Sequence, residues 1–353
     1  MKILYIGTNK EASGWGEASR HDLTVLDAEF DVVSRPMVYS GGVGNKRLDE
    51  LEKKSLDGVT HVIQYCLPSH WQRYGKMKHI GYVEIESCDL SRSSWVDMFS
   101  MVDEIWCPNK DGCNAIRAVW GGPVVYMPHA IDDDVYKKPY KISPIPEVSG
   151  TFKFLCVSEN IPRKNLSQLI EEFWIEFDPT EPVTLILKTN PSITDTINRA
   201  KEKLKLYDLD CYQKIMVIDD RLSNEEMMGL YNHCDCYVNP SMGESWCLPV
   251  IHAVGFNKPV ISIDKGGPKD ILEKYKKAYK VYDNSIYPCE RNNNIPGYQT
   301  GHDWWYKPNH MSLAMGMRAC YSFRPDEDEE DVLLDFSDRI FAEVVNATLN
   351  PRG

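Results

Sequence analysis

The sequence lacks long apolar runs, paired cysteines and an excess of basic charge. Its 353 residues hold 40 Lys and Arg against 52 Asp and Glu, a formal net charge of −12, which argues against nucleic-acid binding by overall charge. Eleven cysteines without a C-x-x-C pair fit reduced thiols rather than a disulfide framework. The opening run Lys2–Ile6 is too short for a signal-peptide core or a membrane span. We therefore expect a cytoplasmic protein with no transmembrane segment.

Two common cofactor signatures are missing as well. The turn after the first expected strand contains Gly14, Trp15 and Gly16, but it continues without the spacing of the dinucleotide fingerprint G-x-G-x-x-G. Such a turn either lets the backbone approach a substrate closely or is a plain connection. No D-x-D motif or His/Cys ligand cluster stands out as a metal site. We expect metal-independent chemistry and no cofactor.

Short apolar strands alternate with helical segments along most of the chain, which predicts the α/β class with parallel sheets covered by helices on both faces. The length allows two cores. Prolines and small residues between positions 139 and 150 mark a linker. We expect a first domain over residues 1–138 and a second over 151–325, with a final helix over 332–349 that packs back on the first. Residues 287–308 are expected to be irregular.

One segment, Ser241 to Ala253, combines a polar turn with the start of a helix. The turn holds Glu244 directly after a buried strand that ends near Asn239, and an apolar helix begins at Leu248. Ligands bind at this edge of open α/β sheets. Unpaired backbone N–H groups there suit an anion, and a carboxylate suits sugar hydroxyls.

This segment, S-x-G-E-x-x-x-L-P-x-x-x-A followed by P-V-I, resembles the donor-site signature of retaining GT-B glycosyltransferases, group 1. The resemblance implies two Rossmann-like domains facing across a cleft, and transfer of a sugar from a nucleotide diphosphate sugar to an acceptor hydroxyl. It implies that Glu244 bonds the donor sugar. His252 stands where the family has a second Glu, which holds the ribose. Substrate-binding candidates around Glu244 are Ser245, Trp246, Cys247 and Leu248, with Gly266 and Gly267 in a later loop.

A basic pair, Arg163 and Lys164, stands at the expected start of a helix in the second domain. Two cations beside helical N–H groups suit a diphosphate, although such a pair is also found on solvated helix ends. The resemblance implies that they stabilise the leaving diphosphate. A further cation of the family is missing, because Ser158 occupies its position.

The candidate catalytic and substrate-binding residues of the first domain follow expected strands. Glu84 and Glu86 come after the strand His79–Val83, and the resemblance favours Glu86 as catalytic because it precedes Ser87; both could also be surface acids. His129 lies near the expected crossing between domains, either as a cleft residue or as a structural histidine. The substrate-binding candidates of the first domain are therefore His129, Gly14, Trp15 and Gly16.

Two other functions stay open at this point. The chain could be a non-catalytic relative that binds nucleotide sugars or carbohydrates, with His252 and Ser158 recording lost activity. It could instead glycosylate hydroxylated nucleic-acid bases, which the acidic charge disfavours. The donor sugar and the acceptor are not encoded in any motif that we can interpret.

Overall fold

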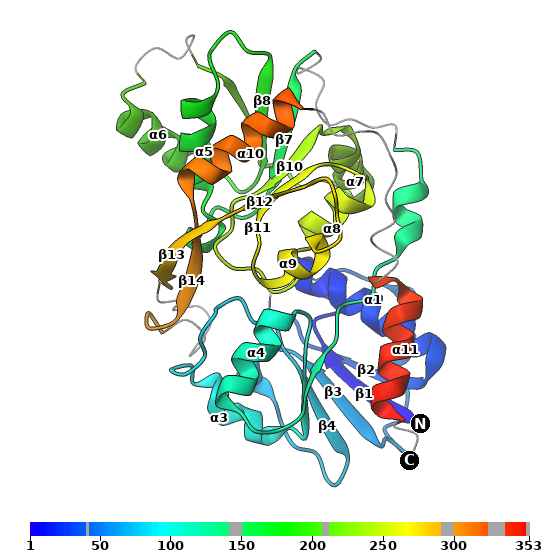
Figure 1. Ribbon diagram of the computed structural model, residues 1–353. Coiled ribbons are helices and arrows are strands. Elements are labelled where there is room, and N and C mark those ends of the chain that lie inside the picture. Colours follow the sequence, from blue (N-terminus) through cyan, green and yellow to red (C-terminus); the bar gives the residue numbers. More distant parts are fainter. Residues whose placement is uncertain (40–41, 141–149, 207–211, 291–299, 324–335, 351–353) are drawn as a thin grey trace. The chain divides into compact units, whose positions relative to one another are not determined.

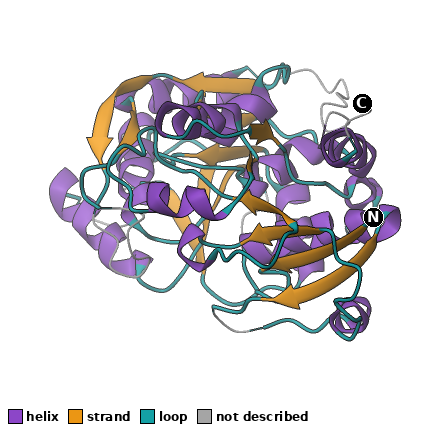
Figure 2. Cartoon of the chain, turned by 90° about the horizontal axis from the view of Figure 1, so that it is seen from below, coloured by secondary structure: helices purple, strands orange, loops and turns teal. Residues whose placement is uncertain are grey.

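The computed structural model describes residues 1–39, 42–140, 150–206, 212–290, 300–323 and 336–350. The contacts divide the chain into two units. One comprises Met1–Asp133, Pro288–Trp304 and Leu333–Gly353, and the other comprises Asp134–Tyr287 and Trp305–Val332. Each unit is built on its own six-stranded parallel sheet, with helices on either side of the strands (Figures 1 and 2).

The sheet of the first unit has the strand order β2-β1-β3-β4-β5-β6. Its strands are β1 (Lys2–Gly7), β2 (Asp31–Pro36), β3 (His61–Tyr65), β4 (Lys78–Tyr82), β5 (Glu104–Cys107) and β6 (Val124–Tyr126). Its helices are α1 (Gly14–Glu29), α2 (Lys46–Glu52), α3 (Trp95–Met98), α4 (Lys110–Val119) and α11 (Asp338–Leu349). The parallel register places the carboxyl ends of β3 and β4 side by side, with Tyr65 opposite Tyr82.

The last helix, α11, belongs to the core of this first unit. Phe341, Val345 and Leu349 recur every four residues, so they form one apolar stripe, and all three are buried against strand residues such as Ile3 and Tyr5. The helix also contacts α1. The chain therefore returns to its first unit after completing the second.

The sheet of the second unit has the order β12-β11-β10-β7-β8-β9. Its strands are β7 (Phe152–Val157), β8 (Val183–Lys188), β9 (Lys214–Ile218), β10 (Cys236–Asn239), β11 (Val260–Ile263) and β12 (Ala278–Val281). Its helices are α5 (Leu166–Glu176), α6 (Ile193–Leu204), α7 (Asn224–His233), α8 (Leu248–Gly255), α9 (Gly266–Leu272) and α10 (His310–Ser322). Two doubly wound parallel sheets confirm the predicted α/β class.

Three local expectations were wrong. Gly14 to Gly16 form the first turn of α1 rather than a loop, because the Ser13 side chain caps the helix by accepting from the Gly16 N–H at 3.3 Å. Gly266 and Gly267 open helix α9 rather than a loop. The stretch 287–308, expected to be irregular, includes parts of the paired strands β13 (Asp283–Pro288) and β14 (Trp304–Pro308). Residues 291–299 and 332–335 lie outside the described part.

Among the described residues, no helix is both long enough and apolar enough to cross a membrane.

Candidate functional site

The Glu244 turn is held tightly between β10 and α8. Cys247, the residue before α8, has φ +68°, a left-handed conformation uncommon for a residue with a side chain. The backbone N–H of Gly267 donates to the Glu244 carbonyl at 3.0 Å. A Cβ atom on Gly266 would lie 2.3 Å from that carbonyl oxygen, and the residue has φ +62°. The two glycines therefore let the start of α9 pack directly on the turn.

The structure brings Glu244 together with the basic pair that precedes α5. The Lys164 Nζ lies 2.6 Å from Glu244 Oε1, and the Arg163 Nη1 lies 3.3 Å from Oε2. The same guanidinium donates to the Gly243 carbonyl at 2.5 Å. The Arg163 carbonyl in turn accepts from the Met242 N–H at 2.8 Å. Main-chain and side-chain bonds thus join two segments that are 80 residues apart.

The charges in this cluster support one another. Glu244 is 8% exposed, and burial alone would raise the pKa of its carboxyl, but the attraction of Lys164 and then of Arg163 outweighs burial and holds the pKa below its usual range. Arg163 is 9% exposed. An ionised carboxylate and two oriented basic side chains therefore meet at the carboxyl edge of a parallel sheet, before a helix start.

The remaining predicted donor-site residues lie around this cluster. Ser245, Trp246 and Cys247 are buried in the turn, and Leu248 is half-buried at the start of α8. His252, one turn further along α8, is buried, with its Nδ1 3.1 Å from the Tyr136 hydroxyl oxygen and its ring 5.1 Å from that of Tyr231. A histidine in this position can exchange a hydrogen bond with a hydroxyl group, as it does with Tyr136.

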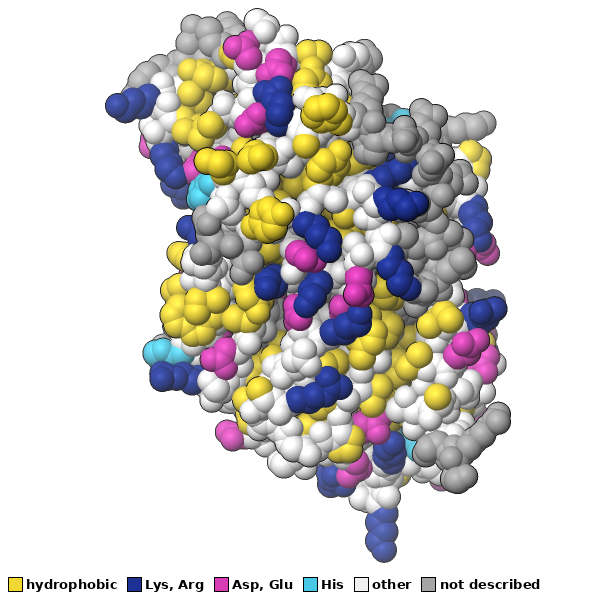
Figure 3. All heavy atoms as spheres, in the orientation of Figure 1, with side chains coloured by type: hydrophobic (Ala, Val, Ile, Leu, Met, Phe, Trp, Pro, Cys, Tyr) yellow, Lys and Arg dark blue, Asp and Glu magenta, His cyan; other side chains and the backbone are white. Residues whose placement is uncertain are grey.

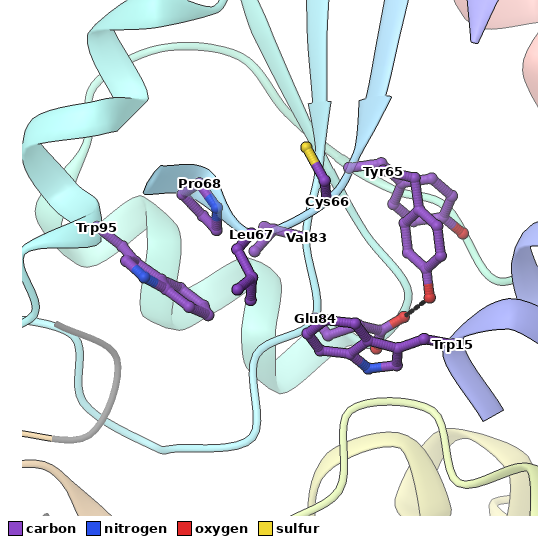
Figure 4. Close-up of a pocket in the computed structure, with 9 residues that line it drawn as sticks. Trp15, Tyr65, Cys66, Leu67, Pro68, Val83, Glu84 and Trp95 are labelled. Atoms are coloured by element: carbon purple, nitrogen blue, oxygen red, sulfur yellow. Dashed lines mark hydrogen bonds between the residues drawn. The ribbon is translucent and has the colours of Figure 1, made fainter. Parts of the chain in front are cut away.

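The first unit contains a second polar arrangement, which lines a small pocket at the ends of β3 and β4 (Figure 4). The lining includes the indole rings of Trp15 and Trp95 and the carboxylate of Glu84. The Tyr65 hydroxyl donates to Glu84 Oε1 at 2.8 Å. An aromatic and apolar wall with one fixed carboxylate is typical of small polar-ligand sites.

Glu84 also bonds His129, which is clamped between two carboxylates. His129 Nε2 lies 2.6 Å from Glu84 Oε1, and Nδ1 lies 2.6 Å from Asp22 Oδ2. The ring is fully buried, and burial lowers its pKa, but Asp22 and Glu84 together raise the pKa to about 10. His129 is therefore an imidazolium at neutral pH, and both of its nitrogens donate.

Of the other candidate site residues in the first unit, only Trp15 lines this pocket. Glu86 is half-buried two residues after Glu84 and is not among the residues that line the pocket. Trp15 lines it, whereas Gly16 packs against the backbone: a Cβ there would lie 2.0 Å from the Glu11 carbonyl oxygen. Gly14 is exposed in the first turn of α1. Sequence analysis missed Asp22 and Tyr65, for which no motif gives a signal.

Within the described ranges, no group of three or more His, Cys, Asp or Glu side chains is arranged to hold a metal ion.

Comparison with known proteins finds a family similarity in the second unit. Residues 141–287 match the family model described as Glycosyl transferases group 1. This range includes Arg163, Lys164, Glu244 and His252. No curated protein matches the chain in a sequence search.

Solved structures of glycosyltransferases share the fold over nearly the full length. HepE of Anabaena, in complex with UDP and glucose, is 13% identical with a TM-score of 0.68, and the match covers 99% of each chain. The trehalose-6-phosphate synthase OtsA is 10% identical with a TM-score of 0.69, again over 99% of each chain. A glycosyltransferase of Rickettsia africae is 13% identical with a TM-score of 0.62, over 99% of this chain and 98% of that one. Residues 141–287 are therefore similar to the glycosyl transferases group 1 family, and the chain has the GT-B fold.

Proposed function

We propose that this protein is a retaining glycosyltransferase that moves a sugar from a nucleotide diphosphate sugar to an acceptor hydroxyl. The observation that carries the proposal is the cluster of Glu244, Lys164 and Arg163 in the segment that matches the family. A carboxylate accepts bonds from sugar hydroxyls, and two adjacent cations complement a diphosphate. One compact cluster thus offers partners for both halves of a sugar diphosphate.

In the proposed reaction the acceptor oxygen forms a bond to the anomeric carbon, and the bond from that carbon to the diphosphate oxygen breaks. The electron pair leaves with the diphosphate, and the proton of the acceptor hydroxyl passes to the departing diphosphate oxygen. Negative charge therefore grows on the leaving group, where Lys164 and Arg163 stabilise it as preorganised donors. Glu244 keeps these cations oriented before the donor arrives, because it contacts both of them.

The proposal assigns distinct roles to the rest of the turn. His252 holds the nucleotide ribose through its imidazole, and the turn from Ser245 to Leu248 surrounds the donor. No cofactor or metal ion takes part, because cationic side chains of the protein stabilise the leaving group. The solved complexes of HepE contain UDP, so UDP-sugars are the first donors to test.

The charge of the surface bears on the base-modifying alternative, because a protein that binds nucleic acid needs a basic surface. On the face shown in Figure 3, Lys and Arg side chains are interspersed with Asp and Glu. Together with the net charge of −12, this favours a carbohydrate or another small hydroxyl acceptor over nucleic acid.

The test begins with a panel of nucleotide sugars, including UDP-glucose, incubated with the protein with and without candidate acceptors. Mass spectrometry measures released nucleoside diphosphate. Turnover of at least one donor is expected. Binding by calorimetry without any release would instead support a non-catalytic relative, and release only with hydroxylated DNA would support the base-modifying alternative.

A single variant then tests the site. Glu244→Gln removes the negative charge but retains a polar side chain of the same size. We expect it to weaken binding of the nucleotide sugar while the free nucleoside diphosphate binds as tightly as before or more tightly, because the site becomes more positive. Equal weakening of both ligands would contradict the assignment of Glu244 to the sugar.

A further inference from the structure

We propose that Lys188, at the end of β8, is a third cation of the donor site and contacts the phosphates of the nucleoside diphosphate. This inference rests on the proposed function and adds a residue that the sequence motif does not contain. It starts from an unusual pair of side chains. Lys188 is half-buried and makes no ion pair with any described residue. Its neighbour Thr189 is 7% exposed, and its hydroxyl has no hydrogen-bond partner in the described structure.

The loop that carries the basic pair runs over the end of β8. The Ser158 N–H donates to the Lys188 carbonyl at 3.0 Å. Two residues later, the Asn160 side-chain amide donates to Ser192 Oγ at 3.1 Å and to Thr196 Oγ1 at 3.0 Å. The chain then continues directly into Arg163 and Lys164. Lys188 therefore lies below the same loop that presents the two predicted phosphate-binding cations.

Strand register places Lys188 on the face of the sheet that carries α8. Lys188 is paired with Val157 in the parallel ladder, and residues in register point to the same face. Leu155, two residues before Val157, shares that face and is in register with Tyr237. The Tyr237 ring lies 5.9 Å from that of Tyr231 on α7, and α7 packs on α8. Lys188 is thus on the side of the sheet from which the Glu244 turn enters α8.

The charge balance of the site also requires a further cation. Arg163 and Lys164 contribute two positive charges, but Glu244 offsets one of them. A nucleoside diphosphate carries more than one negative charge, and an unbalanced buried charge is unfavourable. Lys188 supplies the missing charge without a competing carboxylate. It would replace, from a neighbouring strand, the cation absent at Ser158.

The experiment measures phosphate binding to the full chain by calorimetry. The probes are UDP, GDP, ADP, inorganic pyrophosphate and uridine. The main variant is Lys188→Met, which keeps the aliphatic stem, and Lys188→Arg preserves the charge. Lys201→Ala serves as the control, because Lys201 is also half-buried and without an ion pair among described residues, on α6. Lys201 lies eight residues after Ile193, the first residue of α6, which is roughly 12 Å along the helix.

We expect Lys188→Met to weaken binding of the preferred diphosphate and of pyrophosphate about tenfold or more, a loss on the scale of one charge-assisted hydrogen bond. Lys188→Arg should retain most of the affinity, and Lys201→Ala all of it. Uridine binding should not change with any variant.

Two results would overturn the inference while leaving the proposed function intact. One is parent-like binding of diphosphates by Lys188→Met. The other is equal weakening of uridine and UDP, which would place Lys188 at the nucleoside. If the parent protein binds no nucleoside diphosphate at all, the proposed function fails together with this inference. Circular dichroism of each variant checks the fold, and a misfolded Lys188→Met is replaced by Lys188→Gln.

Discussion

Replacing Lys164 with alanine tests the proposed leaving-group chemistry at its closest contact. The substitution removes the cation 2.6 Å from Glu244 and leaves Arg163, at 3.3 Å, as the remaining partner in the cluster. The charge on the diphosphate grows as the glycosidic bond breaks, so the lost contact matters most in the transition state. Removal of one preorganised donor costs about 2–4 kcal/mol, which corresponds to a fall in kcat of roughly 30- to 1,000-fold.

The same substitution has a second, independent effect on pH dependence. In the parent protein burial alone would raise the pKa of Glu244, but Lys164, Arg163 and a hydrogen bond from Ser241 together outweigh burial and keep that pKa below its usual range. Without Lys164, only Arg163 and the Ser241 hydrogen bond oppose the effect of burial, and the pKa of Glu244 rises. Glu244 must be ionised to orient Arg163, so the acid limb of kcat/KM moves to higher pH in Lys164→Ala than in the parent.

The assay is nucleotide release from the preferred donor, measured between about pH 4 and 8 for the parent, Lys164→Ala and the control Lys201→Ala. We expect a large fall in kcat, a smaller change in KM and an upward shift of the acid limb for Lys164→Ala only. A variant whose kcat matches the parent would refute the assignment to the leaving group. A fall in kcat with an unmoved acid limb would refute the coupling to Glu244.

Three further predictions concern other residues. His252→Ala should weaken nucleotide sugar and free nucleotide alike in calorimetry, because both contain the ribose; parent-like binding of both would show that the second motif position is mapped wrongly. The pocket geometry predicts that Glu84→Gln loses more transfer activity than Glu86→Gln. The family resemblance predicts the opposite order. Nucleotide-release kinetics of both variants decide between the two. The raised pKa of His129, about 10 against an unfolded value near 6.5, stabilises the fold fully below pH 6.5 and progressively less up to pH 10. Urea unfolding of parent and His129→Gln should therefore differ by about 3–5 kcal/mol near pH 6 and by clearly less near pH 10; a difference that does not change with pH would contradict an imidazolium.

The sequence predicted the fold class because apolar periodicity is a local property. Each buried parallel strand, such as Phe152–Val157, is a short and mostly apolar segment with a helical pattern after it, so strand and helix could be recognised one at a time. The pairing of β13 with β14 was missed for the same reason. This pairing joins residues on either side of an intervening segment, as in the bond from the Cys289 N–H to the Asp303 carbonyl at 2.8 Å, and no local pattern indicates that contact.

The candidate sites were predicted only in part, because their parts are distant in sequence. The motif indicated Glu244 and the helix start indicated Lys164, yet their 2.6 Å ion pair spans 80 residues. The clamp on His129 depends on Asp22, which is 107 residues away in the middle of a helix that reads as ordinary in the sequence. An acid on a helix is normally a surface group, and only the packing of α1 on the sheet buries this one.

The ion pairs of Glu244 change how its proposed role must be understood. A carboxylate that only bonded a sugar would need no cations at 2.6 and 3.3 Å. Held between them, Glu244 keeps Lys164 and Arg163 in place before any diphosphate binds, so little reorganisation is needed when charge develops on the leaving group. Glu244 also lowers the net positive charge of the empty site, which weakens retention of the product diphosphate. In the proposed mechanism one buried carboxylate therefore contributes to sugar binding, to preorganisation and to product release.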